Sequence, residues 1–183
     1  MILIKLKIIL FLSTFFINGC VSSLNMFSDP FHASGIVKSR YGVSNQLSYT
    51  HKYLNASIKA IPLIITTGTF KNSGETFSEI DFKVYNKKQP INYKYVELYN
   101  SKGEKWEWEI FSKHKSIKKE KYFFIESYKI RIDSQVSLLL NFFKDDAIYL
   151  KFIGDVNNFK RLDAKHRESI IQVLKFAQNL SEL

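Results

Sequence analysis

Cys20 is the only cysteine in the 183-residue chain, so its sulfur cannot form a disulfide within one copy of the protein. A lone thiolate can act as a nucleophile, bind a metal or receive a covalent modification. Lys5 and Lys7 precede it, and an apolar run over residues 8–17 lies between. A basic start, a short apolar run and small residues at its end are the layout of a secretory signal peptide.

The apolar run spans ten residues, whereas a membrane-spanning helix needs roughly 20. Extending the segment to Phe27 reaches that length only by including polar residues such as Ser13, Asn18 and Asn25. A cleaved signal peptide fits this composition better, and a retained transmembrane anchor is the alternative.

The residues Ile17, Asn18, Gly19 and Cys20 resemble the lipobox of bacterial lipoproteins, at which lipoprotein signal peptidase cuts just before the cysteine. The usual pattern has Leu three residues before the cysteine and Ala or Ser two before it. Ile17 is a conservative departure and Asn18 a looser one, as in spirochaete-type envelope lipoproteins. The resemblance implies that residues 1–19 are removed. It also implies a diacylglycerol on the Cys20 sulfur and a third acyl chain on its amine.

Several acyl chains on one residue anchor a protein stably to a bilayer, whereas one chain binds only marginally. The resemblance therefore implies a bacterial cell-envelope protein held by lipid on Cys20. Val21 follows the cysteine, where the family places Asp in proteins kept at the inner membrane. This favours the outer membrane.

Lipid on Cys20 would leave no free thiol for catalysis, and the other reactive residues form no recognisable motif. No nucleophile elbow, phosphate-binding glycine loop or dinucleotide fingerprint is present. Adjacent carboxylates at Asp145 and Asp146 are typical of a turn and lack the other ligands of a calcium loop. The histidines are far apart in the sequence and lack partners at metal-ligand spacing: His32, His51, His114 and His166.

We therefore expect no catalytic residue, no metal and no cofactor besides the covalent lipid, so that the protein is not an enzyme. A remote alternative remains, because the two carboxylates of a hydrolase converge only in three dimensions.

The densest charged segment covers residues 113–121, with five lysines: Lys113, Lys115, Lys118, Lys119 and Lys121. Charge runs are usually solvated, so one interpretation is an exposed loop between two strands. The other is a contact patch for an anionic membrane or an acidic polymer. Removal of Lys5 and Lys7 leaves 25 basic against 17 acidic residues, a net charge of +8. Nucleic acid is not an expected partner for an exported protein.

The residues from 57 onward predict a β-rich domain. Residues 78–85 alternate strictly, which places Ile80, Phe82 and Val84 toward a core and the charged residues between them toward water. In the segment before them, Pro62 favours an edge or bent strand. Further strand-like runs are 58–70, 122–132, 136–143 and 147–154. A turn over 144–146 predicts that 136–143 and 147–154 form a hairpin.

A hairpin is predicted around Gly103, which can supply a positive φ in the turn. On its return strand Trp106 and Trp108 share one face and charged residues occupy the other. The two indoles could form an exposed platform for stacking on a ligand. A buried ladder opposite Val96 and Leu98 is the favoured interpretation, because the opposite face carries the charges.

The period changes at the C-terminus, where Asp163 can cap a helix over residues 163–180. We expect the helix to pack on the sheet, with a position on a membrane surface as the alternative. His166 belongs to its predicted polar face. The apolar stripe comprises Leu162, Ile170, Ile171, Val173, Leu174, Ala177 and Leu180.

Together these patterns predict an α+β fold, mainly antiparallel β, with about seven strands in a sandwich-like or highly twisted sheet. Residues 20–56 carry the lipidated Cys20 and a tether in which 46–56 is either a short helix or the first strand. Residues 57–183 form a single domain. The expected function is a non-catalytic binding module for a protein or an anionic polysaccharide. A periplasm-facing structural or assembly lipoprotein is the alternative.

Overall fold

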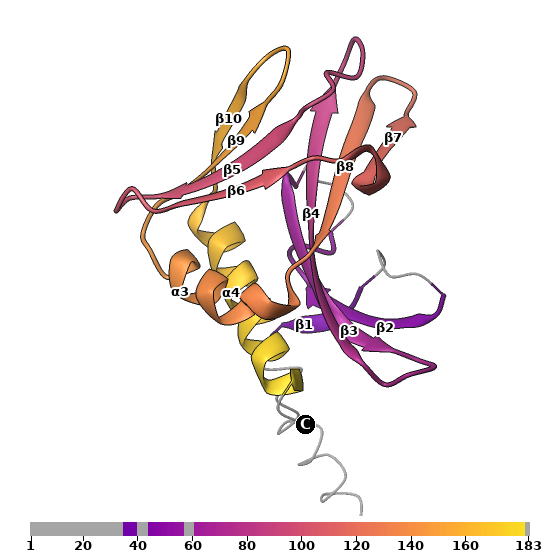
Figure 1. Ribbon diagram of the computed structural model, residues 1–183, viewed down its shortest axis with the longest axis vertical. Helices are drawn as coiled ribbons and strands as arrows, with labels where there is room; N and C mark the ends of the chain where they lie inside the picture. Colours follow the sequence, from indigo (N-terminus) through magenta and orange to yellow (C-terminus); the bar gives the residue numbers. More distant parts are fainter. Residues whose placement is uncertain (1–34, 40–43, 57–60, 182–183) are drawn as a thin grey trace, which may run out of the picture. The chain divides into compact units, whose positions relative to one another are not determined.

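The computed structural model describes residues 35–39, 44–56 and 61–181. These residues form ten strands in two antiparallel sheets and two α-helices. The predicted α+β class is confirmed, with ten strands where about seven were expected. The predictions on Ile17, Asn18, Gly19 and Cys20 lie outside the described residues. Within the folded unit, which starts at Ile36, Figure 1 shows the two sheets set at an angle to each other.

The larger sheet has six strands in the order β1-β2-β3-β4-β8-β7, and each neighbouring pair is antiparallel. Its central strand β4 is the longest in the described fold, and the edges are β1 and β7. The strands are β1 (Ile36–Lys38), β2 (Gln46–His51), β3 (Leu63–Phe70), β4 (Thr76–Asn86), β7 (Lys115–Lys119) and β8 (Phe124–Arg131).

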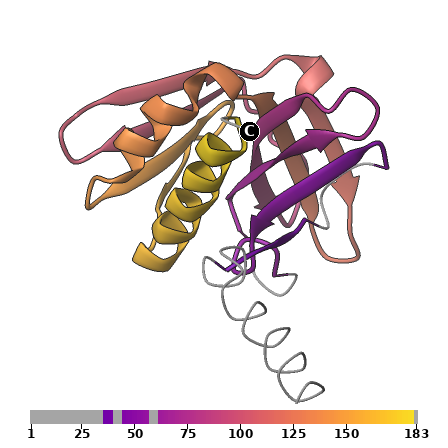
Figure 2. The same cartoon turned by 90° about the horizontal axis from the view of Figure 1, so that it is seen from below.

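The smaller sheet has four antiparallel strands in the order β10-β9-β5-β6. Figure 2 shows the long C-terminal helix running between the two sheets. The strands of this sheet are β5 (Tyr95–Asn100), β6 (Lys105–Glu109), β9 (Ile148–Ile153) and β10 (Asn158–Arg161). The α-helices are α3 (Val136–Phe143) and α4 (Ala164–Ser181), and the 3-10 turns are η1 (Ser112–His114) and η2 (Asp133–Gln135).

Aromatic side chains join the two sheets in the core. The ring centroid of Phe82 in β4 lies 5.4 Å from that of Trp108 in β6 and 6.4 Å from that of Phe152 in β9. The predicted inward positions on β4 are confirmed, since Ile80, Phe82 and Val84 are buried. The side chains on the opposite face of β4 are less exposed to solvent than predicted. Asp81 is buried there against Lys83, and burial raises the pKa of its carboxyl despite that partner.

The tryptophan hairpin is confirmed as a core ladder. Val96 pairs with Trp108 and Leu98 with Trp106. Trp108 is buried and Trp106 partly buried, with the two indoles stacked at 5.7 Å. Gly103 has the predicted positive φ, +80°.

The predicted strand over 136–143 is wrong, because these residues form α3. A continuous apolar run does not distinguish a strand from a buried helix. Burial follows a helical period here, with Val136, Leu139, Leu140 and Phe143 inward and Ser137 exposed. The turn over 144–146 therefore joins a helix to β9 and does not close a hairpin.

The N-terminal part of the domain is also larger than predicted. Residues 46–51 are the strand β2, which resolves the choice left open between a helix and a strand. With β1 it extends the sheet, so the folded unit begins at Ile36 and not at residue 57. Pro62 lies just before β3, which is a central strand and not an edge strand. Its carbonyl accepts the N–H of Lys83 at 2.8 Å, and its missing N–H ends the ladder with β4 there.

The C-terminal helix α4 is confirmed, and it packs on β2, β3 and α3. Asp163 caps it, with its Oδ1 accepting the backbone N–H of His166 at 2.7 Å. The predicted place of His166 on the polar face is wrong. Its side chain is buried, and its Nε2 lies 2.6 Å from the carbonyl oxygen of Leu63. Because a carbonyl oxygen can only accept, the imidazole donates this hydrogen bond.

Candidate functional site

The basic segment 113–121 contains the edge strand β7, so it is not simply the exposed loop that was one of its two interpretations. It comprises the end of η1, the strand β7 and the start of the turn that leads into β8. Among the described strands β7 pairs only with β8, so its other side is open. The side chains of four of its lysines are exposed: Lys113, Lys118, Lys119 and Lys121.

Lys115 is different from the other four. Its Nζ donates to Asn92 Oδ1 at 2.5 Å and lies 3.7 Å from Glu126 Oε2, and its side chain is only 18% exposed. Lys115 thus ties β7 to the connection between β4 and β5. Lys115 therefore does not face outward, and the prediction that it belongs to a contact patch with the other four lysines is wrong.

Glu126 in β8 is a fully buried carboxylate that anchors the β4–β5 connection. It accepts the backbone N–H groups of Ile91 at 2.5 Å and of Asn92 at 3.1 Å. The hydroxyl of Tyr128 donates to it at 2.8 Å, and burial together with this bond raises the pKa of Tyr128. Asn92 adopts a φ of +53°, a left-handed conformation that Asn tolerates better than most residues. Glu126 therefore holds residues 91 and 92 in place.

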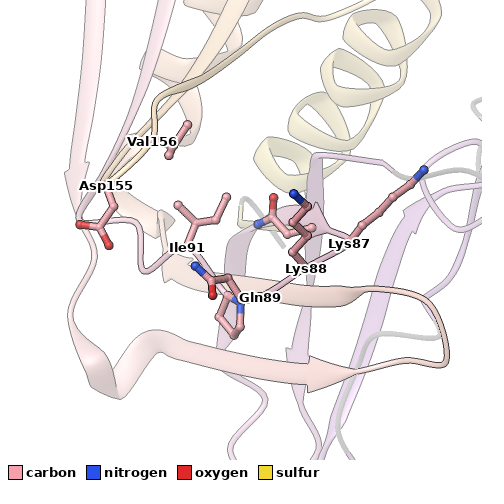
Figure 3. A pocket seen from close by; sticks show the side chains of 8 residues that line it. Lys87, Lys88, Gln89, Ile91, Asp155 and Val156 are labelled. Atoms are coloured by element: carbon pink, nitrogen blue, oxygen red, sulfur yellow. The ribbon is translucent and has the colours of Figure 1, made fainter.

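An open pocket of about 380 Å³ lies between the anchored β4–β5 connection and the turn that joins β9 to β10. This volume is within the range of small-ligand sites. In Figure 3 the side chains of Lys87 and Asp155 extend away from the pocket at its two ends, and Ile91 lies between Val156 and Gln89. The apolar atoms of Ile91 and Val156 thus lie between charges of opposite sign.

The pocket and β7 lie at the same end of the fold. Asn86 pairs with Phe124, which pairs with Lys119, so Lys87 and Lys88 leave β4 beside the turn between β7 and β8. Figure 1 shows the end of β4, this turn and the turn between β9 and β10 at one end of the molecule. We give the name basic end to the exposed lysines beside this turn together with Lys113, which precedes the other end of β7: Lys87, Lys88, Lys113, Lys118, Lys119 and Lys121.

Two acidic residues reduce the charge of the basic end without cancelling it. Glu120 lies 2.5 Å from Lys118 Nζ, and Asp155 lines the pocket. The pair of Lys118 and Glu120 lies at the surface, where ion pairs contribute little energy, so Lys118 can exchange partners readily. Ammonium groups without a buried counter-charge attract carboxylate, sulfate or phosphate groups. The basic end is therefore suited to anion binding.

The adjacent carboxylates at Asp145 and Asp146 serve the fold, as predicted for turn formers. Asp145 accepts from Ser101 and from the backbone N–H of Ala147, and these bonds, the one from the Ser101 hydroxyl first, lower its pKa. Asp146 is exposed and lies 3.6 Å from Arg167. Within the described ranges, no group of three or more His, Cys, Asp or Glu side chains is arranged to hold a metal ion.

Two buried carboxylates escaped the sequence predictions. Strand alternation could have indicated Glu126, because it shares a face with Tyr128 and Ile130. Glu97 is buried on the charged face of β5, where burial opposes ionisation but hydrogen bonds from Lys105 and Tyr99 lower the pKa to about 2. Its burial depends on side chains from β6 and β9, which local sequence does not show.

Comparison with protein-family models, curated proteins and solved structures finds no match to this chain. Of the helices in the described residues, none has the length and apolar composition needed to cross a bilayer.

Proposed function

We propose that the chain is a bacterial envelope lipoprotein, anchored through lipid on Cys20, whose β-rich domain is a non-catalytic binding module for an anionic ligand. The anchor part is supported by Lys5, Lys7, the ten-residue apolar run and the lipobox-like residues 17–20. The absence of Asp after the cysteine favours the outer membrane.

One observation carries the binding part: the basic end brings together exposed lysines from two segments about 30 residues apart in sequence. A solvated charge run would need no second basic segment beside it. Convergence of Lys87 and Lys88 on β7 raises the local positive potential, which attracts a multivalent anion more strongly than separate charges do. An anionic polysaccharide or an acidic protein surface fits this potential.

Heparin binding by the full-length protein in detergent tests the proposal. We expect replacement of Lys113, Lys118, Lys119 and Lys121 by Gln to weaken binding about tenfold and to reduce its dependence on salt. A matched control replaces four exposed lysines outside the basic end, Lys52, Lys102, Lys144 and Lys175, with the same change in net charge. Equal losses in both variants would contradict a localised site, because net charge alone would then explain binding.

Protease treatment of intact cells determines where the module operates. Digestion of the domain in intact cells is expected if it faces outward. Survival in intact cells with digestion after lysis would contradict surface display and place the module in the periplasm.

A further inference from the structure

On its open side, the backbone of β7 has N–H and C=O groups that pair with no strand in the described part of the chain. At the turn, the N–H of Glu120 donates to the carbonyl of Phe123 at 2.8 Å, which marks a hydrogen-bonded pair. Hydrogen-bonded and non-hydrogen-bonded pairs alternate along an antiparallel ladder. Lys118 therefore directs its N–H and C=O toward β8, whereas Ile117 and Lys119 direct theirs away from β8. Since β7 ends the sheet in the described part of the chain, these outward groups face no further strand.

Apolar side chains are also exposed within β7 and in the segments that flank it. Phe111 is 51%, Ile117 46% and Tyr122 71% exposed, and they account for three of the seven large exposed apolar side chains in the described ranges. Lysine on an edge strand is a common protection against aggregation. Protection alone does not explain why apolar side chains flank and interrupt the lysines. An apolar and basic edge instead matches a strand that receives a partner.

We infer that β7 is the docking edge for an extended acidic peptide segment of a partner protein, which adds to the larger sheet as a further strand. This inference rests on the proposed function and specifies its ligand. Main-chain bonds to Ile117 and Lys119 would supply affinity, and the side chains would select the sequence. Lys118 projects from one face of the sheet, and Ile117 and Lys119 project from the other.

The charge pattern also determines which strand is accepted. A second copy of the protein pairing edge to edge would bring lysines against lysines, and like charges on paired strands are unfavourable. Acidic side chains on the incoming strand would instead lie beside Lys118 or Lys119. The edge thus rejects its own copy and accepts an acidic strand.

A synthetic peptide of alternating Glu and Val tests the inference, with binding to the full-length protein in detergent measured by fluorescence anisotropy. The key variant is Lys119→Pro, which removes the outward N–H while leaving the bonds between Lys118 and β8. Its matched control is Lys119→Gln, which removes the charge and keeps the N–H. We expect Lys119→Gln to weaken peptide binding about threefold and Lys119→Pro about tenfold more. Heparin binding should be equal in the two variants.

A peptide N-methylated on alternate residues makes the test independent of how the proline variant folds. Of two such peptides, methylated on odd or on even positions, we expect one to lose binding to the wild-type protein. Equal peptide binding by the two Lys119 variants, or by both methylated peptides and their parent, would overturn strand addition. Heparin binding without peptide binding would also overturn it, while leaving the proposed anion-binding function in place.

Discussion

Glu126 shows how much one buried carboxylate can determine. It accepts two backbone N–H groups and a tyrosine hydroxyl, and Lys115 lies beside it. We predict that Glu126→Ala lowers the free energy of unfolding by about 3 kcal/mol or more, because buried donors and a partly buried ammonium lose their acceptor. Urea denaturation measures the change. Glu120→Ala, which removes a surface partner of Lys118, should cost about 1 kcal/mol or less. Similar losses in the two variants would contradict the anchoring role of Glu126.

His166 should make stability depend on pH. Burial lowers its pKa below the ordinary value of 6.5, although the bond to Leu63 and the charge of Asp163 oppose that shift. As the pH falls below 6.5, the unfolded chain therefore takes up a proton before the folded one does. The contribution of His166 to stability is complete above the unfolded pKa and is lost as the pH falls toward the folded pKa.

The variant His166→Gln tests this pH dependence, because its amide N–H can replace the Nε2 donor without titrating. Comparing urea midpoints at about pH 7 and about pH 5, we expect a smaller loss of stability in the variant than in the wild type. An identical loss would show that other groups cause the acid sensitivity.

At the scale of elements, the pairing of β2 with β3 depends on Gly68. A Cβ at this position would lie 1.8 Å from the carbonyl oxygen of Leu47. We predict that Gly68→Ala lowers the free energy of unfolding by about 2 kcal/mol or more, because the backbone of β2 must move. The neighbouring Thr69→Ala should cost about 1 kcal/mol or less. Thermal or urea unfolding measures both, and a neutral Gly68→Ala would show that the strands separate without cost.

The elements that sequence predicted well have one face buried and the other charged. Alternation was sufficient for β4 and for the tryptophan hairpin, and the cap and stripe of α4 were sufficient for its bounds. Residues 136–143 were predicted wrongly because an apolar run has no charged face to reveal its period. His166 was wrongly assigned to the polar face of α4, because the sequence does not distinguish a buried histidine with a carbonyl partner from an exposed histidine.

The candidate site was only half visible for a related reason. The lysines of 113–121 are evident in the sequence, but their arrangement follows from the pairing of β4 with β8. That pairing, with β5 and β6 in another sheet, brings Lys87 and Lys88 beside β7 and leaves one side of β7 open. Strand order among distant segments is decided by packing of the whole core. Local pattern does not specify it.

At the scale of the whole molecule, we propose a lipid anchor joined to a basic binding module. Cleavage before Cys20 would leave a net charge of +8, which attracts anions generally. The basic end gives that attraction a location, and lipid on Cys20 would hold it at a membrane.

Mass spectrometry of the N-terminal peptide from the membrane fraction tests the anchor most directly. We predict a mature chain that begins at Cys20 and carries the added mass of a diacylglycerol and an amide-linked acyl chain, and we expect Cys20→Ala to leave the membrane fraction. A membrane-bound protein whose peptide runs uncut through residues 17–22 with an unmodified Cys20 would contradict the account.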